Sequence, residues 1–184
     1  MTAASTTEFV VLLDESGSPI GQHDKATVHS FDTPLHFAFS CHVFNSAGQI
    51  LVTRRALSKK AWPGVWTNSF CGHPGPGESL EEAVARRAER ELGLSVMNVR
   101  AALPDFRYRA VDASGIVENE ICPVFVATTD AIPAPADDEV CEFVWADPTA
   151  LLTAVTSSPW AFSPWLTLQL PALAEAGLLT YQPE

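Results

Sequence analysis

A helix with a recognisable signal at each end constrains the fold of this chain more than any other feature. In the stretch GHPGPGESLEEAVARRAERELGL, a Pro/Gly turn precedes Ser79, and Glu82 three residues later completes a capping box. Gly93 follows as a typical helix-ending residue. Between these signals one stripe of apolar residues recurs every four positions, at Leu80, Val84, Ala88 and Leu92. We therefore expect an amphipathic helix that packs this stripe against the rest of the protein.

Segments with strand patterns lie on both sides of this helix. The segments expected to form strands and hairpins span residues 8–25, 35–56 (turning at 45–48), 106–128 (turning near 114–115) and 141–148. The apolar run Cys122–Ala127 predicts a strand that is buried on both faces. Two further helices are expected within residues 148–155 and 163–177, the second capped by Ser163 and Pro164. This order of elements predicts an α+β fold with helices packed on a mixed sheet.

Size and composition fit one globular domain over residues 1–184, with residues 1–7 as a flexible tail. No apolar run reaches the roughly 20 residues that a membrane helix needs, so we expect no membrane partner. The first residues do not have the pattern of a secretory signal. The four cysteines are widely spaced without a CxxC pair, which favours reduced thiols in the cytoplasm.

The net charge of −11 is unevenly distributed along the chain. Residues 110–184 carry 11 acidic residues and neither lysine nor arginine, so the overall field disfavours nucleic-acid binding. Seven of the 11 basic residues nevertheless gather in two runs, at residues 54–60 and 86–90. Such runs are usually solvated faces, but in an acidic chain they also suggest a local anion site.

Three histidines and two glutamates are candidate metal ligands. His29 and His36 lie seven residues apart, and His73 follows Cys71 by two positions. The two glutamates, Glu118 and Glu120, alternate within an expected strand and so share one face. The set would suit a six-coordinate ion such as Mn²⁺, Fe²⁺ or Mg²⁺, or Zn²⁺ with one ligand spare. Structural histidines and the solvent side of a hairpin are the alternatives.

The Pro/Gly turn and its helix resemble the Nudix box, a loop–helix–loop that binds diphosphates through metal ions. Nudix hydrolases carry glutamates where this chain has Arg87 and Arg90, and of that cluster only Glu91 is present. Glutamates there would gather metal ions for hydrolysis, whereas arginines would contact phosphate oxygens directly. Arg87 and Glu91 are also four residues apart, so a simple ion pair on the helix is the competing interpretation.

Longer stretches resemble the type I isopentenyl-diphosphate delta-isomerases, particularly the bacterial form. They are ILVTRRALSKKAWPGVWTNSFCGHP (50–74), PDFRYRAVDASGIVENEICPVF (104–125) and PWAFSPW (159–165). The likeness runs from about Phe9 to Leu170. It implies a Nudix-like α/β/α sandwich with a mixed sheet and extra N-terminal strands. It also implies interconversion of isopentenyl and dimethylallyl diphosphate in isoprenoid biosynthesis, with a prenyl diphosphate as the small-molecule partner and a monomer or weak homodimer.

The resemblance also implies roles for particular residues. The metal ligands, for Mn²⁺ or another divalent ion, would be His29, His36, His73, Glu118 and Glu120. The catalytic residues would be Cys71 and Glu120, assisted by Tyr108 and Trp165. The residues contacting the diphosphate would be Lys25, Arg55, Lys59 and Arg87. A second ion, Mg²⁺ held with the substrate, would involve Glu91 and the backbone of Cys71.

Moving a double bond requires one proton to be added to the alkene and another to be removed nearby, through a state close to a tertiary carbocation. Cys71 and Glu120 suit these steps, and the sequence leaves open which of them donates. The ring of Trp165 would stabilise the cation, and Trp62, Trp66 and Trp160 would help to exclude water. A Nudix hydrolase and a non-catalytic binding module are the alternatives. His42 and the segment after Leu170 receive no role.

Overall fold

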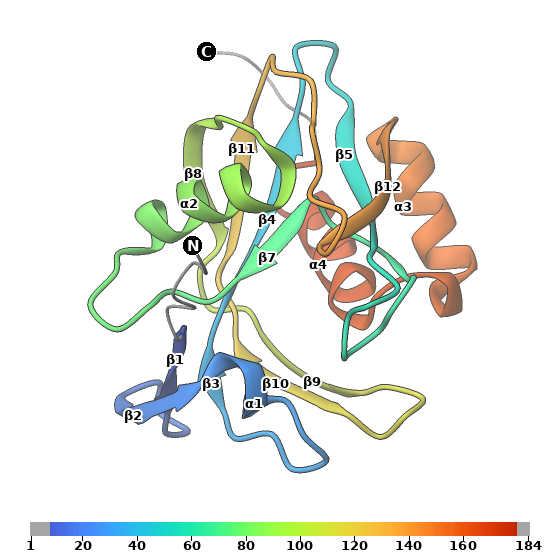
Figure 1. Cartoon of the computed structure of the whole chain (residues 1–184). Coiled ribbons are helices and arrows are strands. Elements are labelled where there is room, and N and C mark those ends of the chain that lie inside the picture. The colour runs from blue at the N-terminus through green and yellow to red at the C-terminus, as the bar shows by residue number, and fades with distance from the viewer. Residues whose placement is uncertain (1–7, 180–184) are drawn as a thin grey trace, which may run out of the picture.

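Two β-sheets form the framework of the protein in the computed structural model, which describes residues 8–179 (Figure 1). The smaller sheet has the order β2 (Pro19–Asp24), β1 (Phe9–Leu13), β3 (His36–Phe37), β10 (Val117–Ile121) and β9 (Arg107–Val111). The larger sheet has the order β12 (Val140–Ala146), β5 (Ile50–Arg55), β4 (Phe39–Phe44), β11 (Val124–Thr128) and β8 (Met97–Leu103). Two short strands extend it, β6 (Trp66–Thr67) on β5 and β7 (Phe70–Gly72) on β4.

The two sheets meet along two nearly continuous segments of chain. Only Ala38 separates β3 from β4, and only Cys122 and Pro123 separate β10 from β11. The strands pair in parallel on both sides of these breaks, β10 with β3 and β11 with β4. Backbone hydrogen bonds from Ala38 to Ile121 and from Ser40 to Pro123 carry the pairing across the junction. Residues of both sheets are therefore brought together at one place.

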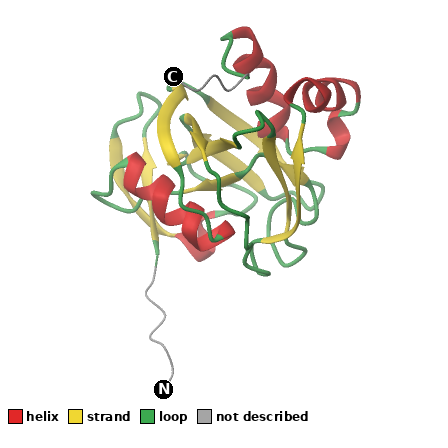
Figure 2. Ribbon diagram, turned by 90° about the horizontal axis from the view of Figure 1, so that it is seen from above, coloured by secondary structure: helices red, strands yellow, loops and turns green. Residues whose placement is uncertain are grey.

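Helices cover both faces of the larger sheet, with α2 (Leu80–Leu92) on one side and α3 (Pro148–Ser157) and α4 (Pro164–Glu175) on the other (Figure 2). Two hydrophobic clusters correspond to these layers. The apolar side chains of α2 in the first cluster are Ala83, Val84, Ala88 and Leu92. Those of α3 and α4 in the second are Leu151, Val155, Leu166, Leu170 and Leu173. The layered α+β arrangement expected from the resemblance is confirmed, and the N-terminal strands lie in the smaller sheet together with β10 and β9.

The central helix α2 has the ends that its sequence predicts. The Ser79 side chain accepts a hydrogen bond from the Glu82 backbone, and the Glu82 side chain accepts one from the Ser79 backbone. Gly93 ends the helix in the left-handed region, at φ 60°. A close approach also positions the helix, because a Cβ atom at Gly72 of β7 would lie 2.6 Å from Cγ of Arg87. The glycine thus lets the helix pack directly on the strand.

The C-terminal segment completes the second core cluster. Ser163 caps α4, Pro164 is its first residue, and the helix continues to Glu175. Leu173 and Leu179 are buried in that cluster, so the segment after Leu170 contributes to the core even though the sequence suggested no role for it. Among the described helices, none has the length and apolar character needed to cross a bilayer. The tail expected at residues 1–7 lies outside the described residues.

Candidate active site

A cavity of about 210 Å³ opens at the junction of the two sheets. Thirteen residues have a catalytic, metal-binding or diphosphate-binding role implied by the sequence, and twelve of them line the cavity, namely Lys25, His29, Arg55, Lys59, Cys71, His73, Arg87, Glu91, Tyr108, Glu118, Glu120 and Trp165. The thirteenth, His36, is fully buried, and its ring touches those of His29 and His73. Residues far apart in the chain therefore converge on one site. Cys71 and Glu120 in particular share a single cavity.

Four potential ligand atoms converge at one end of the cavity. They belong to His29, His36, His73 and Glu120, and all lie within 4.8 Å of one another. Nε2 of His36 is 3.2 Å from Nε2 of His73, and Oε1 of Glu120 is 3.4 Å and 3.2 Å from these two atoms. Because Nδ1 of His36 donates to the carbonyl oxygen of Pro34, Nε2 is the atom that faces Glu120: it donates to the carboxylate when the ring is protonated and presents a lone pair when the ring is neutral.

Glu118 adds a fifth donor beside this group. Its Oε2 atom lies 2.8 Å from Nε2 of His29, yet both atoms are buried without a hydrogen-bond partner among the described residues. Buried polar atoms are normally hydrogen-bonded, so two neighbouring buried atoms without a hydrogen bond indicate that both would contact a third, shared partner. Imidazole nitrogens and carboxylate oxygens that face one another in this way fit a divalent metal ion.

Burial decides between the two interpretations of the alternating glutamates. Only 6% of Glu118 and 5% of Glu120 is exposed, so this face of β10 is not the solvent side of the hairpin. Burial raises the pKa of Glu118, with the charge of Glu120 adding to the effect. Burial also acts to raise the pKa of Glu120, but its hydrogen bonds with His36 and His73 outweigh this and lower the pKa well below the usual range.

Cys71 faces this carboxylate group from β7. Its Sγ atom donates to Oδ1 of Asn68 over 3.3 Å and lies 3.3 Å from Oγ of Ser40. Burial raises the pKa of the Cys71 thiol to about 12, although the hydrogen bond with Ser40 acts in the opposite direction. The sulfur is therefore a protonated thiol at neutral pH. Such a group can exchange a proton with a bound molecule and, because it is not a thiolate, is a poor nucleophile.

Aromatic rings form one wall of the cavity beside the thiol. Trp165 is 2% exposed, and its Nε1 atom donates to Oδ1 of Asn68 over 2.9 Å. The ring centroids of Tyr108 and Trp62 lie 5.8 Å and 5.5 Å from that of Trp165. The guanidinium carbon of Arg55 is 5.3 Å from the same centroid. This ring therefore already stabilises one cation in the structure.

Two of the water-excluding tryptophans expected from the sequence do not belong to this wall. Trp160 is 84% exposed, because the 3₁₀ turn η1 (Pro159–Ala161) presents it to solvent. Trp66 packs against the hydrophobic cluster beneath α3 and α4 instead of lining the cavity. The prediction was wrong for these two residues. Composition does not reveal toward which side of a strand or turn a ring points.

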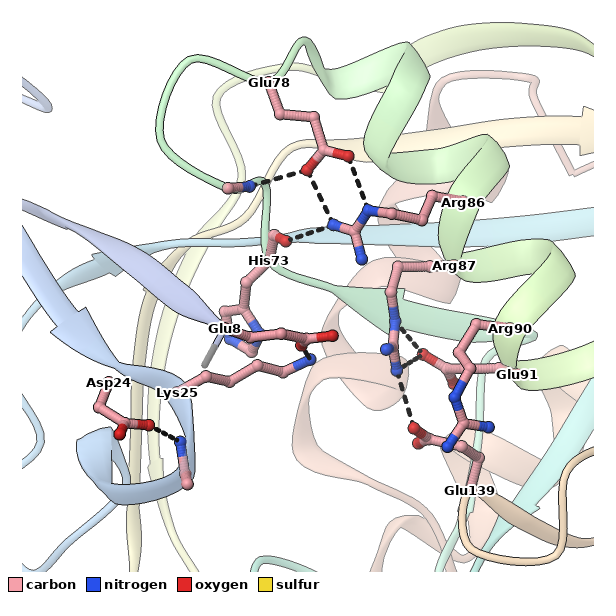
Figure 3. A network of polar contacts seen from close by, with 12 residues as sticks. Glu8, Asp24, Lys25, His73, Glu78, Arg86, Arg87, Arg90, Glu91 and Glu139 are labelled. Carbon is pink, nitrogen blue, oxygen red and sulfur yellow. Dashed lines mark hydrogen bonds and ion pairs between the residues drawn. The ribbon is translucent and has the colours of Figure 1, made fainter. Parts of the chain in front are cut away.

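The opposite end of the cavity is strongly charged. Arg87 donates to Glu91 over 2.5 Å and to Glu139 over 3.1 Å (Figure 3). Lys59 also pairs with Glu139, and Lys25 pairs with Glu8 over 2.6 Å. Arg87 thus combines both expectations, since it pairs with Glu91 along the helix and also lines the cavity. Its pKa is raised above the usual range because the charges of Glu91 and Glu139 outweigh the effect of burial.

The structure adds Glu139, which the sequence analysis did not single out. It is 8% exposed, lines the cavity and bridges Lys59 and Arg87. The acidic run before β12 was the only signal, and it resembles an ordinary solvated turn. Arg90, by contrast, pairs with Asp138 on the surface and does not reach the cavity, so the expected contact with a phosphate is wrong for this arginine.

The fold, the capped helix and the adjacent charged cavity together define the class of protein. A model of the NUDIX domain matches residues 34–166. A Deinococcus radiodurans protein of known structure is similar with a TM-score of 0.70 and 21% identity over 89% of this chain and 98% of its own. A MutT NUDIX hydrolase from Burkholderia pseudomallei is similar with a TM-score of 0.57 and 22% identity over 76% of this chain and 98% of its own. The chain is a Nudix-fold protein.

Curated relatives identify the family within this class. A protein of Leifsonia xyli subsp. xyli named isopentenyl-diphosphate Delta-isomerase is 68% identical over 92% of this chain and 92% of its own length. Proteins of the same name from Kocuria rhizophila and Klebsiella pneumoniae subsp. pneumoniae are 61% and 55% identical, over 96% and 88% of this chain and 99% and 88% of their own lengths. The chain belongs to the isopentenyl-diphosphate Delta-isomerases.

Proposed function

We propose that Cys71 and Glu120 are the two proton-transfer groups with which this isomerase interconverts isopentenyl diphosphate and dimethylallyl diphosphate. The shared cavity supports this assignment most directly, because a thiol and a carboxylate line the same cavity. One proton is added to the terminal carbon of the alkene, and one leaves the carbon next to the oxygen-bearing carbon. Because the reaction is reversible, the group that donates in one direction accepts in the other.

The remaining lining residues divide into two ends with different chemistry. Trp165 and Tyr108 surround the olefin end, where their rings exclude water and face the cation that forms on protonation. The cations at the other end would hold the diphosphate by charge-assisted hydrogen bonds. They are Lys25, Arg55, Lys59 and Arg87. We therefore expect the charged head of the substrate at the basic end and its olefin beside Trp165, whose ring Arg55 also contacts.

The donor set supports a divalent ion such as Mn²⁺ at His29, His36, His73, Glu118 and Glu120. When bound there, the ion would supply Lewis-acid chemistry by offsetting the charge of the buried carboxylates and tuning the acidity of Glu120. Glu91 and the backbone of Cys71 would contribute to a Mg²⁺ site together with the substrate diphosphate. A cytoplasmic location and a monomeric or weakly dimeric state stay predictions from the sequence.

Hydrolysis of a diphosphate is the alternative, and the residues on α2 argue against it. A Nudix hydrolase uses several glutamates on this helix to gather metal ions, whereas here Arg87 occupies the cavity side next to Glu91. The guanidinium group leaves room for phosphate binding but removes carboxylate ligands. Release of inorganic phosphate or diphosphate from isopentenyl diphosphate by the purified protein would favour the hydrolase.

The direct test is incubation with isopentenyl diphosphate and Mg²⁺ in deuterated water, followed by NMR of the product. We expect dimethylallyl diphosphate that carries solvent deuterium, because the alkene is protonated during the reaction. Cys71→Ala should lower kcat by at least about 100-fold, the usual contribution of a proton-transfer group. Cys141→Ala, which removes an exposed thiol outside the cavity, is the matched control. Near-normal turnover by Cys71→Ala would contradict the assignment.

A further inference from the structure

A continuous chain of polar side chains runs through the core behind Cys71. Nε2 of His42 is 3.0 Å from Oε1 of Gln169, and Nε2 of Gln169 donates to Oγ of Ser40 over 2.9 Å. Oγ of Ser40 in turn lies 3.3 Å from Sγ of Cys71. His42, Gln169 and Ser40 all have 0% exposure and do not line the cavity. Only the last member of the chain, Cys71, can meet a substrate.

The direction of these hydrogen bonds follows from the groups involved. The amide oxygen of Gln169 only accepts, so the proton of the His42 ring resides on Nε2. The amide nitrogen of Gln169 only donates and occupies one lone pair of the Ser40 hydroxyl. Oγ of Ser40 has one lone pair and one proton left for its two sulfur neighbours, Cys71 at 3.3 Å and Cys122 at 3.4 Å. All the hydrogen-bonding positions of the Ser40 hydroxyl are therefore used when the Cys122 thiol donates to Oγ and the hydroxyl donates to Sγ of Cys71.

A second group holds Cys71 from the other side. Nδ2 of Asn68 donates to the backbone oxygens of Cys41 and Phe70 over 3.0 Å and 2.7 Å, which fixes Oδ1 toward the thiol. This one oxygen also receives Nε1–H of Trp165 and the hydroxyl of Thr67, each over 2.9 Å. A carbonyl oxygen has two lone pairs, and an S–H group is the weakest of these three donors. Of the three hydrogen bonds to Oδ1 of Asn68, the one from the Cys71 thiol is therefore the most easily broken.

Burying this row of polar side chains destabilises the fold, which argues against a purely structural role for it. Nδ1 of His42 has no hydrogen-bond partner among the described residues and is inaccessible to solvent. An unsatisfied buried polar atom destabilises the folded state, and an apolar side chain in the same place would avoid this cost. Asn68 and the neighbouring apolar residues already pack this part of the core. What the chain adds is an oriented hydroxyl at the sulfur of Cys71.

We propose that Ser40, Gln169 and His42 are positioning residues that hold the sulfur of Cys71 toward the double bond while the thiol proton leaves its hydrogen bond to Oδ1 of Asn68. Ser40 makes the contact, Gln169 orients the Ser40 hydroxyl, and His42 orients the Gln169 amide. The inference rests on the proposed role of Cys71 in proton transfer. It assigns a function to His42, whose sequence context gave none.

The test compares Ser40→Ala with Ser69→Ala. Ser69 is an equally buried serine whose hydroxyl joins the backbones of Val43 and Leu51 and does not touch Cys71. We expect Ser40→Ala to lower kcat about five- to tenfold, as the loss of one neutral hydrogen bond implies, with KM for isopentenyl diphosphate unchanged. The infrared S–H stretching band of Cys71, assigned by its loss in Cys71→Ala, should shift. Ser69→Ala should lower thermal stability but leave both kcat and this band as in the wild type.

The proposal is overturned if Ser40→Ala keeps the wild-type kcat or leaves the S–H band unmoved, or if Ser69→Ala changes both in the same way. Should Ser40→Ala fail to fold, His42→Phe carries the same expectation, with a smaller fall in kcat and a shifted band. A normal kcat in Cys71→Ala would instead refute the proton-transfer role. The band would still report whether Ser40 contacts the sulfur, so the two failures are distinguishable.

Discussion

At the scale of single residues, burial decides what the polar side chains of this protein mean. Glu118 and Glu120 have an ordinary surface interpretation in the sequence and His42 has no role there, yet each of the three is at most 6% exposed in the structure. A buried carboxylate needs a partner, and the neighbouring histidines supply one for Glu120. The two carboxyl groups of β10 consequently have pKa values that move in opposite directions. Such separation is typical of functional sites.

His42 makes the stability of the protein sensitive to acid. Burial lowers its pKa to about 4, with the Gln169 hydrogen bond acting in the opposite direction, whereas an unfolded chain has a histidine pKa of about 6.5. Below pH 6.5 the unfolded state binds the proton first, so this residue destabilises the fold increasingly as the pH falls toward 4. We expect the loss of unfolding free energy between pH 7 and pH 5 to be about 2 kcal/mol smaller in His42→Phe than in the wild type.

Urea unfolding at the two pH values measures this difference, because the pH 7 value of each protein serves as its own reference. His23→Phe is the control, since His23 lies on the edge strand β2 outside the core. If the wild type and His42→Phe lose the same unfolding free energy between pH 7 and pH 5, His42 is not held neutral by its surroundings.

At the scale of elements, the sequence predicted those with strong local signals. The capping box, the apolar stripe and Gly93 predicted α2, and turn residues predicted the β4–β5 and β9–β10 hairpins. The strands β6, β7 and β8 were not predicted. β6 and β7 have two and three residues, too few for any periodicity to show, and β8 is mostly exposed and lacks an alternating pattern. Pairing with β4, β5 and β11 determines their conformation, which is a long-range effect.

The contact between α2 and β7 should couple stability to substrate affinity. A methyl group at Gly72 would overlap Cγ of Arg87 and the ring of Phe39, which approach to 2.6 Å and 2.9 Å. We expect Gly72→Ala to displace Arg87 from the cavity and to raise KM for isopentenyl diphosphate severalfold. The unfolding free energy should fall by about 1–3 kcal/mol, the usual cost of overpacking. Steady-state kinetics and urea unfolding of the purified variant measure the two effects.

Ser79→Ala separates the two effects, because it weakens the same helix at its far end. Removing the cap should cost about 1 kcal/mol of unfolding free energy and leave KM unchanged. A KM in Gly72→Ala that equals that of Ser79→Ala would show that Arg87 does not contribute to diphosphate binding.

At the scale of the whole molecule, the site exists only where the two sheets join. His36 comes from β3, Glu118 and Glu120 from β10, His73 from the loop after β7, and His29 from the end of α1 (Lys25–Val28). The residue types suggested these five residues as candidate metal ligands, and the family resemblance implied the same set. Their convergence depends on the parallel β3–β10 pairing, which no local pattern encodes. The contacts of Glu139, and the row of polar side chains behind Cys71, depend on the same long-range geometry.

A metal ion at the five-donor site would therefore tie the small sheet to β7 of the large sheet and stabilise the molecule as a whole. An ion that binds only the folded state adds RT ln(1 + [L]/Kd), about 2.7 kcal/mol at a concentration of 100 Kd. For a protein of this size, that free energy corresponds to a rise in Tm of roughly 5–10 °C. We expect Mn²⁺ to raise Tm by this amount after EDTA treatment, and His73→Ala to abolish the rise. His23→Ala, which removes a histidine outside the cluster, should retain it. An equal rise in His73→Ala and His23→Ala would place the ion elsewhere, and no rise in the wild type would mean that the convergent histidines and glutamates do not hold Mn²⁺.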